Sequence, residues 1–184
     1  MSSDIHHSSF IIHHFYHPFP IVLGLGGNLG PVREAFDQAI RLFERLGVTL
    51  QNRSRLYHAR PWGVPDQPDY LNAAIAVRTR LRPLELLWLC LHVESSLGRK
   101  RRLRWGARRI DVDLLMYGNH LMNHPRLKLP HPRIAKRDFV LQPLIDLGIP
   151  PHPAIAPAGW GALLRAIPRA ERLIYHSEDW PEPL

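Results

Sequence analysis

The stretch FPIVLGLGG, residues 19–27, is the first segment of the chain with a clear structural pattern. A short apolar run that ends in glycines predicts a buried strand entering a tight turn. Pro31 then suits a first helical position, and apolar residues recur at helical spacing from Val32 to Leu46, until Gly47 stops the run. Residues 19–47 therefore predict a strand followed by an amphipathic helix.

The chain after Gly47 continues with further strands and helices. Up to residue 97, the predicted elements are a strand over VTLQNRSRLY (48–57), a long loop over ARPWGVPDQPD (59–69), a strand over YLNAAIAVRT (70–79) and a helix over residues 83–97. They are followed by a strand over IDVDLLMYG (110–118) and a turn over KLPHPRI (128–134). The last two are short helices over DFVLQPLIDL (138–147) and GWGALLRAI (159–167). A βαββαβ order predicts an α+β fold with a ferredoxin-like core, in which helices pack on the faces of a mainly antiparallel sheet as an α-β-α sandwich.

Composition sets the class of protein. A chain of 184 residues with 45% hydrophobic residues can bury a core, which excludes a disordered protein. We expect one domain over residues 19–184, preceded by a flexible extension at 1–18 that contains five histidines. The single cysteine, Cys90, cannot form an internal disulfide, no run of 18 apolar residues occurs, and Asp4 stands where a secretory signal needs a basic start. We therefore expect a cytoplasmic protein that does not enter membranes.

Positive charge is concentrated in one segment. The formal net charge is +8, and the stretch RKRRLRWGARR (99–109) holds seven positive charges and no acid. Such a local excess favours a binding loop for an anion, because the acids elsewhere could neutralise it only in a crowded network. Trp105-Gly106 adds an aromatic plane beside a flexible hinge, as a mobile lid would need. A solvated basic loop and a nucleic-acid-binding loop remain alternatives.

Asp111-Val112-Asp113 follows the basic stretch directly. On a strand, residues two apart share a face and stand about 6.5 Å apart along the chain, so both carboxylates project one way while Ile110, Val112 and Leu114 face the core. Magnesium takes one or two protein carboxylates and completes its coordination with water and substrate phosphates. Acids for a metal beside arginines for phosphate predict nucleotide chemistry, although an exposed edge strand would show the same pair.

Two further positions offer binding chemistry. Asn72 supplies a donor and an acceptor, and Tyr70 shares its face of the strand, which suits a flat heterocycle with amide-like edges. A strand cap and a core tyrosine are the plainer interpretation. His131, held between Pro130 and Pro132, could pair with phosphate or be structural. The glycine-rich stretch 24–30 has neither the dinucleotide-binding nor the Walker A spacing.

Four ordered blocks together resemble one enzyme family. LGLGGNLG (23–30), RPWGVPDQPDYLNA (60–73), GRKRRLRWGARRIDVDLLMYG (98–118) and LPHPRIAKRDFVLQPL (129–144) are similar to the signature blocks of 6-hydroxymethyl-7,8-dihydropterin pyrophosphokinases. The resemblance runs from about residue 20 to 150. It implies transfer of the pyrophosphoryl group of ATP to the pterin hydroxymethyl group in folate biosynthesis, with AMP released and two Mg²⁺ ions bound with ATP.

The resemblance also implies roles for individual residues. Asp111 and Asp113 would bind the two metal ions and, with Arg99 and Arg108, form the catalytic set. The pterin would contact Trp62, Tyr70, Asn72 and Phe139, and ATP would contact Glu94, Arg104, Trp105, Leu114, Arg126, Lys128, His131 and Arg137.

This sequence departs from the family pattern at three places. Gly27 replaces the usual Ser of the glycine turn, Ala59-Arg60 replaces Thr-Pro before the pterin loop, and Ala107 replaces a Pro that would stiffen the basic loop. None of the departures removes a predicted metal ligand, so we expect an active, monomeric enzyme.

The alternatives are a basic RNA-binding module of the same topology and another Mg-dependent nucleotidyl or phosphoryl transferase. We expect no nucleic-acid binding, because paired carboxylates facing the phosphates would repel RNA and no RNP1-like aromatics occur.

Overall fold

The computed structural model describes residues 20–61, 66–99 and 106–181 of the chain. The predicted extension at 1–18 lies outside the described residues, as do three of the predicted site residues, Trp62, Arg104 and Trp105. The prediction of one domain over 19–184 therefore stays a prediction.

The antiparallel sheet predicted from the element order is present. Its strands are β1 (Ile21–Gly27), β2 (Thr49–Arg53), β3 (Leu56–Ala59), β4 (Tyr70–Arg78), β5 (Asp111–Tyr117) and β8 (Ile174–Glu178). They run in the order β5-β1-β4-β3-β8, with β2 also paired to β4, and every pair is antiparallel. The first four strands in this order, β5-β1-β4-β3, have the ferredoxin-like arrangement, and β8 adds a strand at the edge next to β3.

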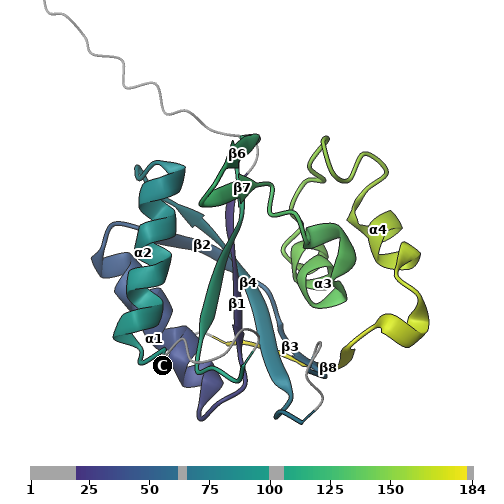
Figure 1. The fold of residues 1–184 in the computed structure, drawn as a ribbon, viewed down its shortest axis with the longest axis horizontal. Coiled ribbons are helices and arrows are strands. Elements are labelled where there is room, and N and C mark those ends of the chain that lie inside the picture. The colour runs from purple at the N-terminus through teal and green to yellow at the C-terminus, as the bar shows by residue number, and fades with distance from the viewer. Residues whose placement is uncertain (1–19, 62–65, 100–105, 182–184) are drawn as a thin grey trace, which may run out of the picture.

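Helices cover both faces of this sheet, as predicted for an α-β-α sandwich. Figure 1 shows α1 (Val32–Arg45) and α2 (Pro83–Ser96) on one face, and α3 (Asp138–Asp146) with α4 (Trp160–Ala166) on the other. Short 3₁₀ turns, η1 (Ile134–Lys136) and η2 (Arg169–Glu171), connect the last elements. Among the described residues, no helix has both the length and the apolar character that a membrane crossing needs.

Three details differ from the predicted elements. The segment 48–57 is two strands, because Ser54 interrupts the ladder: its hydroxyl oxygen accepts the Ala74 N–H at 3.0 Å. The segment predicted as a turn at 128–134 instead begins in a hairpin of β6 (Met122–His124) and β7 (Leu127–Leu129). Strand β8 was not predicted, because its sequence IYHSE is largely polar and gains its partner only from β3.

Two cores result from the alternation of side chains across the sheet. Leu23, Leu25 and Val112 pack beneath α1 and α2, whereas Leu115 and Met116 pack beneath α3 and α4. On the side of β1 that faces α3, however, the strand carries Gly24 and Gly26, which have no side chains. A Cβ on Gly24 would meet Leu115 at 3.2 Å, and one on Gly26 would meet the Asn72 side-chain oxygen at 3.4 Å. The missing side chains leave room for a cavity on this face of the sheet.

Candidate active site

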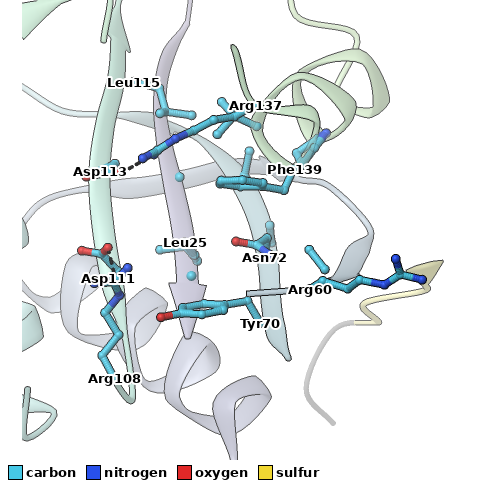
Figure 2. A pocket seen from close by; sticks show the side chains of 17 residues that line it. Leu25, Arg60, Tyr70, Asn72, Arg108, Asp111, Asp113, Leu115, Arg137 and Phe139 are labelled. Carbon is cyan, nitrogen blue, oxygen red and sulfur yellow. Dashed lines mark ion pairs between the residues drawn. The ribbon is translucent and has the colours of Figure 1, made fainter. Parts of the chain in front are cut away.

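A narrow slot of about 90 Å³ lies between the sheet and α3. Its floor is made by β1, β4 and β5, whose alternate residues face α3, and its far wall by Phe139 and Val140 of α3. Figure 2 shows the rings of Tyr70 and Phe139 on opposite sides of the slot, with the side chain of Asn72 between them. This arrangement suits a flat ring.

Asn72 presents an unsatisfied polar group to the slot. The residue is 7% exposed, and its Nδ2 is buried without a hydrogen-bond partner among the described residues. A buried amide that lacks a partner costs free energy, so such groups in native proteins call for an explanation. A ligand with a carbonyl or ring-nitrogen acceptor would supply the missing partner.

Tyr70 is held in place from both sides. Its hydroxyl donates a hydrogen bond to Gln67 Oε1 at 3.2 Å, and the Gly106 carbonyl oxygen lies 3.4 Å away. The guanidinium of Arg108 lies over the ring, 5.5 Å from its centroid. The segments on either side of the slot entrance therefore meet at Tyr70.

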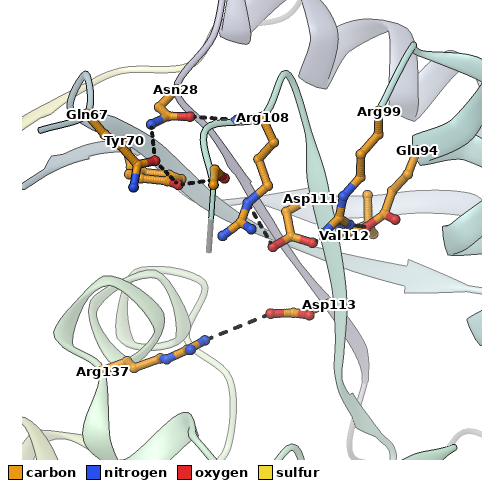
Figure 3. A network of polar contacts seen from close by, with 11 residues as sticks. Asn28, Gln67, Tyr70, Glu94, Arg99, Arg108, Asp111, Val112, Asp113 and Arg137 are labelled. Carbon is orange, nitrogen blue, oxygen red and sulfur yellow. Dashed lines mark hydrogen bonds and ion pairs between the residues drawn. The ribbon is translucent and has the colours of Figure 1, made fainter. Parts of the chain in front are cut away.

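Asp111 and Asp113 lie where the slot opens into a second cavity, and both line both cavities. Arg99 Nη1 lies 2.6 Å from Asp111 Oδ1, and Arg108 Nε lies 3.2 Å from Asp111 Oδ2, as Figure 3 shows. Arg137 is farther from its acid, with Nη1 4.0 Å from Asp113 Oδ2. Burial among the cavity walls, followed by repulsion from Asp111, raises the pKa of Asp113 to about 6, although 42% of its side-chain surface is accessible from the cavities. Two crowded carboxylates of this kind fit a cation.

Glu94 organises the strand from behind. It is 2% exposed, pairs with Arg99, and accepts the Val112 N–H at 2.7 Å. Burial, followed by the nearby charge of Asp111, raises its pKa to about 7, whereas the Val112 N–H and Arg99 favour the ionised form. Through these contacts Glu94 orients both the first arginine of the basic stretch and the backbone between the two aspartates.

Asn28 connects three segments, and sequence reasoning missed it. Its Oδ1 accepts the Arg108 N–H at 2.8 Å, its Nδ2 donates to the Pro68 carbonyl at 3.0 Å, and its own N–H donates to the Arg108 carbonyl at 2.8 Å. The neighbouring departure, Gly27, permits this approach, because a Cβ there would lie 2.5 Å from the Arg109 carbonyl oxygen. The only sequence signal is an asparagine inside a glycine turn.

The second cavity is a cleft of about 870 Å³ along the β5 edge of the sheet. It is bordered by α2, the β6–β7 hairpin and the segment 131–137, and cations line it on several sides. Trp88 also lines it, 57% exposed, with the Arg126 guanidinium 5.7 Å from its ring centroid. The prediction missed Trp88 because the helix 83–97 is apolar on every side in sequence, so nothing separates a cleft residue from a core residue.

His131 contributes a defined hydrogen-bond donor to this cleft. The backbone N–H of His131 donates to the Leu115 carbonyl at 2.8 Å, which fixes the turn to β5. Its ring Nδ1 accepts the backbone N–H of Arg133 at 3.3 Å. Burial, followed by Arg137 and Arg133, lowers the pKa of His131 to about 4, so the ring is neutral at pH 7. With Nδ1 accepting, the proton of the neutral ring is on Nε2, where it can be donated.

The structure brings the predicted residues together at these two cavities. The slot holds Tyr70, Asn72 and Phe139; the cleft holds Arg99, Glu94, Leu114, Arg126, Lys128 and His131; and Arg108, Asp111, Asp113 and Arg137 line both. Arg60, from the second departure, lines the slot, and Arg133 joins the cleft. The role of each residue stays a prediction.

A carboxylate pair between a ring-sized slot and an arginine-lined cleft, on a ferredoxin-like fold, fits the class of enzymes that transfer phosphate groups. A family model described as 7,8-dihydro-6-hydroxymethylpterin-pyrophosphokinase (HPPK) matches residues 22–149. The chain belongs to this family, whose members are the pyrophosphokinases of folate biosynthesis.

Curated relatives agree over the same region. A pyrophosphokinase from Pseudomonas aeruginosa is 44% identical over 128 residues, which cover 69% of this chain and 79% of the relative. One from Synechocystis is 42% identical over 68% of this chain and 65% of the relative. A folate synthesis bifunctional protein from Arabidopsis thaliana is 43% identical, and the match spans only 26% of that longer protein. The crystal structure of Plasmodium falciparum HPPK-DHPS has a TM-score of 0.62 at 15% identity, over 80% of this chain and 44% of that one, which supports the fold alone.

Proposed function

We propose that the chain transfers the pyrophosphoryl group of ATP to the hydroxymethyl oxygen of 6-hydroxymethyl-7,8-dihydropterin, giving AMP and the pterin diphosphate. One observation carries the proposal: Asp111 and Asp113 lie at the junction of the two cavities, with a ring-sized slot on one side and a cation-lined cleft on the other. An acceptor in the slot and a triphosphate in the cleft would meet at these carboxylates.

The slot chemistry supports a pterin. Tyr70 and Phe139 offer flat faces on opposite sides, and stacking on both faces of a ring favours an aromatic heterocycle over an aliphatic substrate. The buried, unpartnered Nδ2 of Asn72 gives the amide-like edge of the pterin a donor, and a ligand without the matching acceptor would leave this group unpaired. Trp62 is assigned to the pterin by the resemblance alone.

The two aspartates fit Mg²⁺, because carboxylate oxygens on a rigid strand are hard ligands and leave other coordination positions to water and phosphate. When bound, the two ions would neutralise the triphosphate charge and orient the transferred group. The arginines now paired with Asp111 would then turn toward phosphate oxygens, so Arg99 and Arg108 exchange one anion for another.

The other residues that line the cleft would contact different parts of ATP. His131 would donate from Nε2 to a phosphate oxygen, and Arg137 would act from the same side. Leu114, Arg126 and Lys128 would contact the adenosine end, with Arg104 and Trp105 of the basic stretch assigned by resemblance. Glu94 would act by positioning Arg99 and β5. No side chain is required as a general base, because holding the two reactants in line can itself supply several kcal/mol of barrier reduction.

Incubation with ATP, Mg²⁺ and 6-hydroxymethyl-7,8-dihydropterin tests the proposal. Separation of the nucleotides should show AMP and pterin diphosphate formed in equal amounts, and no AMP when the pterin is omitted. Formation of ADP would instead indicate an ordinary kinase. No nucleotide product at all would overturn the enzymatic function.

The remaining expectations are part of the same proposal. We infer a monomer that acts on ATP and the pterin. We also infer that it does not bind nucleic acid, because carboxylates at the centre of the site would repel a nucleic-acid backbone. A cytoplasmic location is also proposed; one Arabidopsis thaliana relative is named as a mitochondrial bifunctional protein.

A further inference from the structure

Three metal-binding side chains meet at the edge of the sheet opposite β5. His58 of β3 and His176 of β8 are direct cross-strand partners, and Glu178 follows two residues later on β8. One ligand atom from each of the three lies within 4.8 Å of the others. Figure 1 shows β8 running beside β3 at this edge, whereas the two aspartates lie on β5 at the other.

The polar groups of this cluster are incompletely satisfied. His58 Nε2 is buried and has no hydrogen-bond partner among the described residues, and the nearest acceptor, Glu178 Oε1, is 3.5 Å away. The imidazole rings of His58 and His176 lie 5.2 Å apart between centroids. A cation between the three groups would give His58 Nε2 the partner that the protein does not supply.

The ligand types determine which cation fits. Two imidazoles and a carboxylate suit zinc and neighbouring transition metals, whereas magnesium prefers oxygen ligands alone. Paired strands hold the backbone of all three residues, so little freedom is lost on binding. His58 and Glu178 are half-buried and His176 is exposed, which leaves an open path to the site.

We propose that His58, His176 and Glu178 bind one Zn²⁺ ion that fastens β8 to β3, with a fourth position open to water. The ion would anchor the C-terminal segment, which continues to Trp180. That residue packs against Phe36 at 5.8 Å between ring centroids, and its Nε1 donates to Asp37 Oδ1 at 3.0 Å. His58 lies inside residues 22–149, the range matched to the family, whereas His176 and Glu178 on β8 lie beyond it.

The test is a calorimetric titration of the full chain with ZnCl₂ in excess Mg²⁺, which occupies sites made of carboxylates alone. The five N-terminal histidines (His6, His7, His13, His14, His17) are first changed to Asn to remove their own zinc affinity. We expect one Zn²⁺ per chain in this background. His58→Asn, His176→Asn and Glu178→Gln should each weaken the affinity at least about tenfold, since even outer-sphere partners of a metal are worth 10–100-fold. His92→Asn, an exposed histidine on α2, is the matched control and should bind as the background does.

Thermal unfolding gives a second readout that does not depend on enzymatic activity. Zinc should raise the unfolding midpoint of the background and of His92→Asn, because a ligand that binds only the folded state stabilises it. At the same zinc concentration the midpoint of His176→Asn should rise clearly less than that of the background, and because His176 is exposed this variant is expected to fold. Binding that survives all three ligand substitutions, binding lost in Asp113→Ala, or no binding at all would each overturn the proposal.

Discussion

The slot and the cleft share Asp111 and Asp113 but differ in size and in the side chains that line them. The slot is about a tenth of the size of the cleft, and its shape is set by the sheet, by the side-chain-free positions Gly24 and Gly26, and by α3. The cleft is wide, and its walls are arginines, Lys128 and His131 on several different segments. Under the proposed function, recognition of the ring would therefore depend mainly on the preformed shape of the slot, and recognition of phosphate mainly on the charge of the cleft.

The strongest test of this comparison removes what the two cavities share. Asp113→Ala should reduce turnover by roughly a thousandfold or more, the scale at which loss of one electrostatic group acts on a transition state. Steady-state AMP formation measures the loss, and far-ultraviolet circular dichroism checks that the fold is retained. The matched control is Asp179→Asn, an exposed carboxylate paired with Arg55 outside both cavities. Turnover within a factor of a few of the unmodified protein would show that Asp113 does not serve the reaction.

The slot alone is tested by Asn72→Leu. Loss of a buried hydrogen bond costs about 1–3 kcal/mol, so pterin affinity should fall by roughly tenfold to a hundredfold while the KM for ATP stays unchanged. Since Nδ2 has no partner in the free protein, the free energy of unfolding without ligand should not decrease. Fluorescence titration with pterin and chemical denaturation provide the two measurements. Asn52→Leu, an exposed position on β2, serves as the control. A destabilised variant with unchanged pterin affinity would assign Asn72 to the core.

The cleft alone is tested by Trp88→Ala. An exposed cation–π pair contributes about 0.5–1 kcal/mol, so removing the ring beneath Arg126 should raise the KM for ATP by about twofold to fivefold. The KM for the pterin should not change, because Trp88 does not line the slot. Leu46→Ala removes another exposed apolar side chain, at the end of α1 and outside both cavities, and should change neither value. An equal rise in both Michaelis constants would contradict a separation of the two cavities.

The last test concerns the charge of the cleft and its effect on stability rather than on turnover. The pKa of His131 is lowered from 6.5 to about 4, so between these values the unfolded chain binds more protons than the folded protein. The contribution of His131 to the free energy of unfolding is therefore complete above about pH 6.5 and is lost as the pH falls toward 4. His131→Asn retains an acceptor for Arg133 but removes this titration. Between pH 7 and 4.5 the variant should lose about 1–2 kcal/mol less stability in chemical denaturation than the unmodified protein. Identical losses would mean that neither burial nor the arginines of the cleft lower the pKa of His131.

Local sequence pattern was sufficient for most of the fold. Helices α1 and α2 end within about two residues of their predicted limits, because proline at the start and glycine after the end are signals read along the chain. The predicted elements were wrong where the local structure depends on a residue that is distant in the chain. Ser54 breaks a continuous strand pattern by bonding Ala74, and β8 becomes a strand only because β3 offers an open edge.

The candidate site divides in the same way. The resemblance pointed to many of the residues that line the two cavities, but Trp88 carries no local signal, and the only signal for Asn28 is an asparagine inside a glycine turn. Asn28 acts through the backbone of Arg108, 80 residues away in the chain. Contacts of this separation depend on how the elements pack and not on the residues beside them.

What the sequence determined by itself is that Asp111 and Asp113 share a face, because residues two apart on a regular strand project to the same side of the sheet. Tertiary structure alone decided which cavity that face meets. Packing of α3 closes the slot beside Asp113, and the fold of the segment after β7 brings His131 and Arg137 across from it. The physical reason is that strand geometry is set by the local backbone, whereas the surroundings of a carboxylate are set by which distant elements bury their apolar faces together.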